Sequence, residues 1–268
     1  MEQWRIEEPT SLDLEGVQRL NVRLVAGSVD VVGRSDGDAG EAHVGVTDVK
    51  GPLIVTLENG TLTITHERLT WGGLLDWVDR RQACAIVSIA VEQSCPVELG
   101  VVSADAVVSG IDAERTTVKS VSGDLTLDGV RSDISAQTVS GDLESRHLTG
   151  ALRFTTVSGD LTVVDGSSGS VRAETVSGQV TLDLDLPSGG RIDLSSVSGD
   201  MTVRLPDGVG LGVDVTTMSG RLDSAFDGVE REKKPGRNSL RGQLGTGEGR
   251  LRAKTVSGDV TLLRRDPA

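Results

Sequence analysis

The sequence predicts an all-β fold: a single-stranded, β-helix-like β-solenoid of about ten short coils with a small flap or cap insertion. A repeated motif, strand-like spacing of apolar residues and a composition of 34 Gly without Tyr support this prediction. Self-similarity at a period near 20 residues is typical of stacked repeats. The motif reads Thr-Val-Ser-Gly-Asp-Leu at 138–143. Its glycines, which we expect at structural turns, are Gly123, Gly141, Gly159, Gly178, Gly199, Gly220 and Gly258.

Within one repeat the apolar residues follow the strand period of two, as at Leu125 and Leu127. We expect all apolar residues of a coil, including Val121 and Val139, to fill an interior shared with coils ~4.8 Å away. We expect the Thr before each Val and the Thr after each Leu to stack outside. The motif glycine is expected to supply a positive φ where the strand direction breaks.

Composition narrows the class of function. The 268 residues carry a formal net charge of −13 and only three Trp and two Phe, which argues against binding to nucleic acid. The same charge argues against electrostatic docking on anionic lipid. The sequence shows neither a signal peptide nor a run of ~20 apolar residues, so we expect a cytoplasmic protein without a membrane span. Cys84 and Cys95 are expected to be reduced, although a bridge between strands stays open.

In chain order, we expect an N-terminal segment at 1–11, a repeat domain at 12–263 and a frayed tail at 264–268. Residues 20–31 keep the spacing of a repeat, and Asn59-Gly60 predicts a hairpin turn. Insertions are expected near 65–82 and 227–238. The second is predicted as the charged loop 230–238 of a coil that has lost its motif, because the last two motif glycines are 38 residues, or 2 × 19, apart. Residues 239–244 would restore that coil, and 251–263 would close the stack.

Residues 69–81 interrupt the pattern and contain two of the three Trp. One interpretation is a flap over an end or flank of the solenoid, because exposed edges need covering. The other is a contact surface for a partner or a membrane surface, where Trp is favoured. The candidate contact residues are Trp71, Leu74, Leu75 and Trp77.

Few residues suggest chemistry. The motif aspartates should form a column with rungs ~4.8 Å apart. Asp124, Asp142 and Asp160 are the candidate ligands of a cation site, but Gln179 and Arg221 interrupt the column, which favours a solvated turn. The three His are scattered and predict no zinc site. The glycine-rich segment 245–249 lacks the Lys-Ser/Thr of a phosphate loop and is interpreted as a turn. We predict no catalytic residue and no cofactor.

The recurring Thr-Val-Ser-Gly-Asp-Leu-Thr-Leu pattern, the segment 24–31 and the Pro-bearing strand before Val97 resemble a bacterial β-strand-repeat family. It is the family called "putative adhesin", or the toastrack domain. The resemblance extends from about 10 to 263 and is specific for fold. It implies a link to membranes or to envelope-stress signalling and brings no catalytic residues.

These observations favour a non-catalytic interaction scaffold with an unknown protein partner, in an envelope-stress module. A surface adhesin is the alternative, and a carbohydrate-active enzyme is less favoured. Self-association through the solenoid ends is a further possibility.

Overall fold

The computed structural model describes residues 1–35, 39–66 and 83–265, and every regular element in these ranges is a β-strand. The all-β prediction is confirmed. The chain divides into two compact units, Met1–Asp133 and Ile134–Ala268, here called the N-terminal and the C-terminal unit. Most strand pairs within each unit are parallel and in register, as a solenoid-like fold requires.

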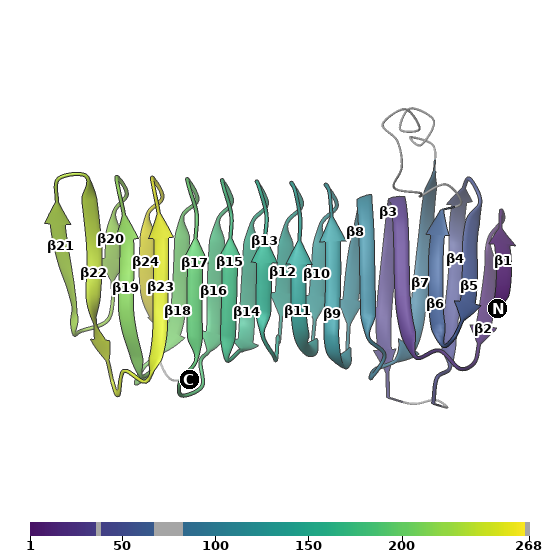
Figure 1. Cartoon of the computed structure of the whole chain (residues 1–268), viewed down its shortest axis with the longest axis horizontal. Coiled ribbons are helices and arrows are strands. Elements are labelled where there is room, and N and C mark those ends of the chain that lie inside the picture. Colours follow the sequence, from purple (N-terminus) through teal and green to yellow (C-terminus); the bar gives the residue numbers. More distant parts are fainter. Residues whose placement is uncertain (36–38, 67–82, 266–268) are drawn as a thin grey trace. The chain divides into compact units, whose positions relative to one another are not determined.

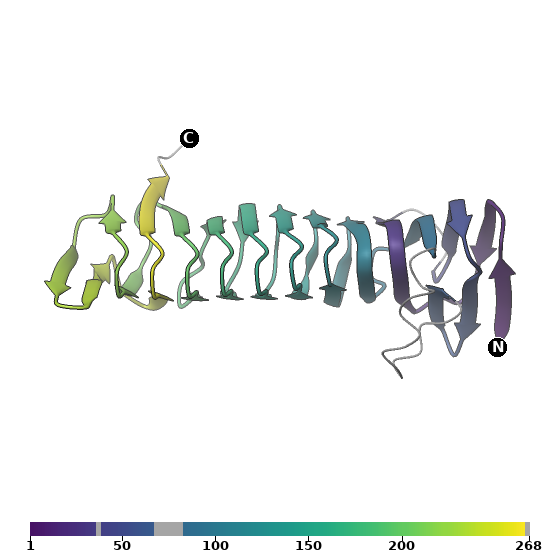
Figure 2. The same cartoon turned by 90° about the horizontal axis from the view of Figure 1, so that it is seen from above.

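The coils of the C-terminal unit place their strands in two ladders, on opposite sides of the unit (Figures 1 and 2). The first ladder, in spatial order, is β11 (Arg131–Gln137), β13 (Leu152–Thr155), β15 (Ser170–Glu174), β17 (Arg191–Ser195), β23 (Gly249–Thr255), β19 (Leu211–Thr217), β22 (Arg237–Leu244) and β21 (Val229–Lys234). The second is β12 (Leu143–Arg146), β14 (Leu161–Ser167), β16 (Val180–Asp185), β18 (Met201–Pro206), β24 (Val260–Arg265) and β20 (Leu222–Ser224).

The interior between these ladders is a stack of aliphatic side chains. Leu161 is fully buried and lies in register with Leu143 on one side and Val180 on the other. Thr162, the next residue, faces outward in register with Thr181. The predicted inward Leu and the outward Thr that follows it are therefore confirmed.

The motif glycine lies where neighbouring coils approach most closely. None of the motif glycines adopts a positive φ, so the reason predicted for Gly was wrong. A Cβ atom added at Gly199 would lie 1.7 Å from the carbonyl oxygen of Gly178, and one at Gly178 would lie 1.8 Å from that of Gly159. Gly is required because no side chain fits between the two backbones.

The Ser or Thr before each motif Val points inward. Ser196 is 6% exposed, and its hydroxyl accepts a hydrogen bond of 2.8 Å from the Gly199 N–H. Because successive residues point to opposite sides, the Val that follows faces solvent. Val139 is 48% and Val121 44% exposed. The prediction that these valines fill the interior, with the preceding Thr outside, was wrong.

The last coil of the chain is not the last coil of the C-terminal unit. β23 pairs in parallel with both β17 and β19, and β24 with both β18 and β20. The coil of residues 249–265 is thus inserted between two coils that are consecutive in sequence. The prediction that 251–263 closes the stack was wrong.

The predicted charged loop is a strand of a hairpin. β21 and β22 pair antiparallel around a Pro235-Gly236 turn, and β22 also pairs antiparallel with β19. Residues 239–244 therefore cover the last coil and do not restore a lost repeat. At the tail, β24 continues to Arg265, whose guanidinium lies 3.2 Å from the carboxylate of the buried Asp183. The predicted fraying therefore does not begin at 264.

The N-terminal unit shows the same kind of insertion. Its strands are β1 (Glu2–Ile6), β2 (Thr10–Leu14), β3 (Arg19–Arg34), β4 (Ala42–Lys50), β5 (Leu53–Glu58), β6 (Thr61–His66), β7 (Cys84–Glu92), β8 (Val97–Ser109), β9 (Asp112–Ser120) and β10 (Leu125–Asp128). The long strand β3 lies in parallel between β8 on one side and β6 and β7 on the other. Antiparallel strands β5 and β1 continue from β6, and β4 and β2 continue from β7.

Three local predictions hold in this unit. Gly27 lies in register with Ala104, so residues 20–31 form a coil as expected. Asn59 and Gly60 take φ of 50° and 74° in the turn between β5 and β6. Cys84 and Cys95 are free thiols, and burial raises the pKa of Cys95 to about 11.

Candidate binding site

The residues predicted to contact a partner, Trp71, Leu74, Leu75 and Trp77, lie outside the described residues. The end of the C-terminal unit, where self-association was predicted, is formed by β21. This strand, Val-Glu-Arg-Glu-Lys-Lys, exposes every residue from Glu230 to Lys234. Charged edge strands disfavour pairing with another chain, so this edge is protected against β-sheet extension.

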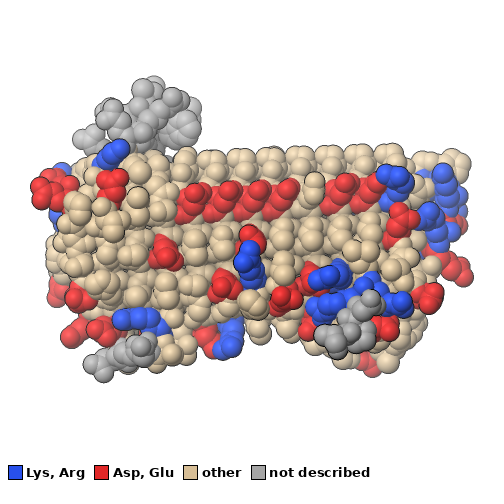
Figure 3. Space-filling model, turned by 180° about the vertical axis from the view of Figure 1, so that it is seen from behind, with Lys and Arg blue, Asp and Glu red and all other residues tan. Residues whose placement is uncertain are grey.

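Several aspartates of the column fasten their coil to a neighbouring coil of the same unit. The Asp142 carboxylate accepts a hydrogen bond of 2.8 Å from the Asp160 N–H, and the Asp160 carboxylate accepts one of 2.7 Å from the Gln179 N–H. The Asp259 carboxylate accepts an equivalent hydrogen bond of 2.7 Å from the Arg221 N–H, and this bond lowers the pKa of Asp259. In the N-terminal unit, the Asp124 N–H donates to Asp105. Figure 3 shows the acidic side chains as a line. Among the described residues, no three His, Cys, Asp or Glu form a group that could hold a metal ion.

The three histidines lie in different surroundings. His43 contacts Asp13 at 2.6 Å, and His147 is exposed. His66 is 3% exposed, and its Nδ1 accepts a hydrogen bond of 3.3 Å from the Val25 N–H. Burial lowers the pKa of His66.

The buried His66 predicts that the N-terminal unit loses stability in mild acid. Because the folded state holds His66 neutral, the unfolded chain binds the proton first, and stability falls as pH drops below about 6.5. We expect a decrease of up to about 1.4 kcal/mol per pH unit, measured by urea unfolding between pH 7.5 and 5. His66→Asn keeps an acceptor but does not titrate, so it should flatten this dependence. An equal slope in this variant would contradict the assignment.

The outward valines of the C-terminal unit form an apolar ridge. Consecutive coils are joined beside it, as where the Ser177 N–H donates to the Val157 carbonyl oxygen at 3.0 Å. The ridge consists of five valines and one methionine, each between 44% and 58% exposed: Val139, Val157, Val176, Val197, Val256 and Met218. In each coil the residue of the aspartate column follows three positions later. The sequence did not reveal the ridge, because alternation predicts an outward Val only once the preceding Ser or Thr is known to be buried.

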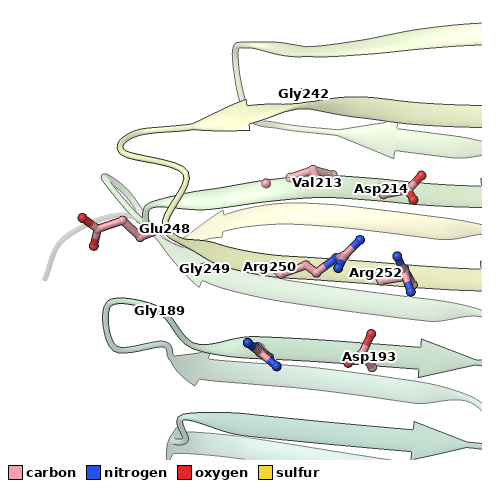
Figure 4. A pocket seen from close by; sticks show the side chains of 11 residues that line it. Gly189, Asp193, Val213, Asp214, Gly242, Glu248, Gly249, Arg250 and Arg252 are labelled. Carbon is pink, nitrogen blue, oxygen red and sulfur yellow. The ribbon is translucent and has the colours of Figure 1, made fainter.

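A second feature is a groove of about 570 Å³ on the outer face of the first ladder, over β17, β23, β19 and β22. Figure 4 shows Arg250 and Arg252 of β23 beside Asp193 of β17 and Asp214 of β19. Gly212 and Gly242 also line the groove and leave it open above their strands. An added Cβ at Gly212 would meet only the Gly249 carbonyl oxygen, at 3.7 Å.

The strand register places the charges of the groove in two rows. In one row Arg191 stands directly opposite Arg250, which stands opposite Gly212. In the other, Arg252 stands between Asp193 and Asp214. Asp214 lies 3.3 Å from Arg241, whereas Arg191, Arg250 and Arg252 form no ion pair among the described residues.

The groove depends on the inserted coil. β23 brings Arg250 and Arg252 between β17 and β19, which belong to two coils that are consecutive in sequence. The turn predicted at 245–249 is confirmed for residues 245–248, whereas Gly249 begins β23; Glu248 and Gly249 line the groove. Sequence reasoning missed the site because it expected the coils to stack in chain order.

The part of the chain that the structure describes contains no helix long and apolar enough to cross a membrane. A search of curated proteins found no match to the chain.

The chain resembles solved structures at low sequence identity. A "putative adhesin" from Bacteroides fragilis has a TM-score of 0.51 and 10% identity, with 96% of this chain and 98% of that chain covered. A "putative lipid binding protein" from Parabacteroides distasonis has a TM-score of 0.46 and 10% identity, with 96% and 97% covered. The profile of the family described as Toastrack DUF4097 matches residues 23–263, which is most of the sequence. The chain therefore belongs to the Toastrack family.

Proposed function

We propose that this protein is a non-catalytic binding scaffold whose apolar ridge docks a protein partner. The observation that supports the proposal most strongly is the half-exposed ridge of six aliphatic residues in the C-terminal unit, with the aspartate column three residues farther along each coil. A contiguous exposed apolar strip is a frequent mark of a protein interface. The aspartates favour a partner that presents basic residues beside an apolar strip, and they disfavour a second copy of this acidic chain.

A photo-reactive side chain at position 176 should crosslink to such a partner in cells. Val157→Lys should lower the affinity of the purified partner about tenfold or more, because it places a charge in the apolar contact and repels a basic partner. Affinity should also fall with salt.

The matched control is Thr181, an exposed position of the same coil that lies outside the ridge. Crosslinks that are identical from positions 176 and 181, or a partner that binds the Val157→Lys variant as tightly as the wild type, would reject the ridge as the docking surface.

We also propose a cellular role and a location for this scaffold. The resemblance of the motifs supports a role in envelope-stress signalling, and an unchanged stress response in a deletion strain would count against it. The adhesin-like neighbour supports surface binding as the alternative to a cytoplasmic location. Cell fractionation separates the two settings.

A further inference from the structure

The groove over β17, β23, β19 and β22 contains two arginines whose positive charges repel each other. Arg191 and Arg250 stand opposite each other on neighbouring parallel strands, where like charges are unfavourable. Neither side chain forms an ion pair among the described residues, although the exposed Arg172 of the adjacent strand β15 contacts Glu174 at 2.6 Å. An arginine pair left without a carboxylate is suited to an anion from outside.

The groove also contains a donor with no acceptor. The Nε atom of Arg252 is buried and has no hydrogen-bond partner within the described part of the chain. This N–H is covered by protein atoms, so the donors that a ligand in the groove can reach are those of the exposed Arg191 and Arg250. Gly212 extends the row of Arg191 and Arg250 without a side chain, which leaves a space beside the two guanidinium groups.

The acidic residues of the groove narrow the class of ligand. Glu248 also lines the groove and accepts a hydrogen bond from the Ser188 hydroxyl. Asp193 and Asp214 line it in the row next to the arginine pair. These carboxylates would repel a dianion such as phosphate, but they accept hydrogen bonds from hydroxyl groups. A ligand that suits both rows has one carboxylate and several hydroxyls. A cavity of about 570 Å³ is large enough for a short oligosaccharide.

We infer that this groove binds an acidic saccharide. Arg191 and Arg250 hold its carboxylate through charge-assisted hydrogen bonds, Asp193 and Asp214 accept from its hydroxyls, and Gly212 leaves room for the ring. This site is separate from the apolar ridge, so the two proposals stand or fall independently.

Calorimetric titration of the full chain tests the inference. The probes are trigalacturonate, a glucuronate-containing oligosaccharide and a sialyl oligosaccharide, with a neutral galactose trisaccharide and inorganic phosphate for comparison. We expect saturable binding of at least one acidic probe. Arg191→Ala and Arg250→Ala should each weaken it about tenfold or more, since each removes a charged hydrogen-bonding group.

Two variants separate groove binding from general charge. Gly212→Leu keeps both arginines and should abolish binding by filling the groove, while Arg153→Ala removes an exposed arginine of β13 outside the groove and should change nothing. Thermal melting checks that each variant is folded, and loss of Arg250 should leave the melting temperature unchanged or raise it. Failure of all acidic probes to bind, equal binding of the neutral trisaccharide, or equal binding of phosphate would overturn the inference.

Discussion

Leu161→Asp should unfold the C-terminal unit. Leu161 is fully buried and lies in register with Leu143 and Val180, so the carboxylate would enter an interior lined by these aliphatic side chains. An unpaired buried charge costs more than about 4 kcal/mol, a large share of the stability of a domain. Urea and thermal unfolding followed by circular dichroism measure the loss.

The neighbouring residue provides the matched control. Thr162→Asp introduces the same side chain one position along β14, on the outward face, and should change stability by no more than about 0.5 kcal/mol. A Leu161→Asp variant that melts like the wild type would show that the inward face of β14 is assigned incorrectly.

Gly199→Ala should be nearly as damaging, although it adds only one methyl group. The new Cβ atom would lie 1.7 Å from the Gly178 carbonyl oxygen, and the backbones of two coils would have to separate. Both coils are held by parallel ladders on either side, so the strain cannot relax locally. We expect a loss of about 3 kcal/mol or more in the free energy of unfolding.

Two further variants identify the cause. Gly169→Ala should be neutral or slightly stabilising, because its nearest neighbour would be the Pro187 side chain at 3.8 Å and its φ is not positive. Gly199→Asn should be as harmful as Gly199→Ala. Asn tolerates a positive φ, so a mild effect of Asn with a severe effect of Ala would restore the conformational explanation in place of the steric one.

The site was less predictable than the fold. The inward Ser196 and the outward Val197 follow from one fact that the motif does not state, which is that the Ser196 hydroxyl accepts a hydrogen bond from the Gly199 N–H. A hydrophobicity pattern assigns Val to the interior and Ser to the surface, and here the hydrogen bond of a buried N–H decides otherwise. The ridge was therefore not predicted, because the rule that assigns Val to the interior fails at this position of the motif.

The period and the alternation of apolar residues by themselves determined an all-β stack of short coils, because each coil needs the same inward Leu and the same motif glycine. They could not determine which coils are neighbours. Every coil presents nearly the same edge, so the free energy of strand pairing barely distinguishes one stacking order from another. The segments that connect the coils therefore determine the order. Only the tertiary structure shows residues 249–265 inserted between earlier coils, and that insertion alone brings Arg250 opposite Arg191.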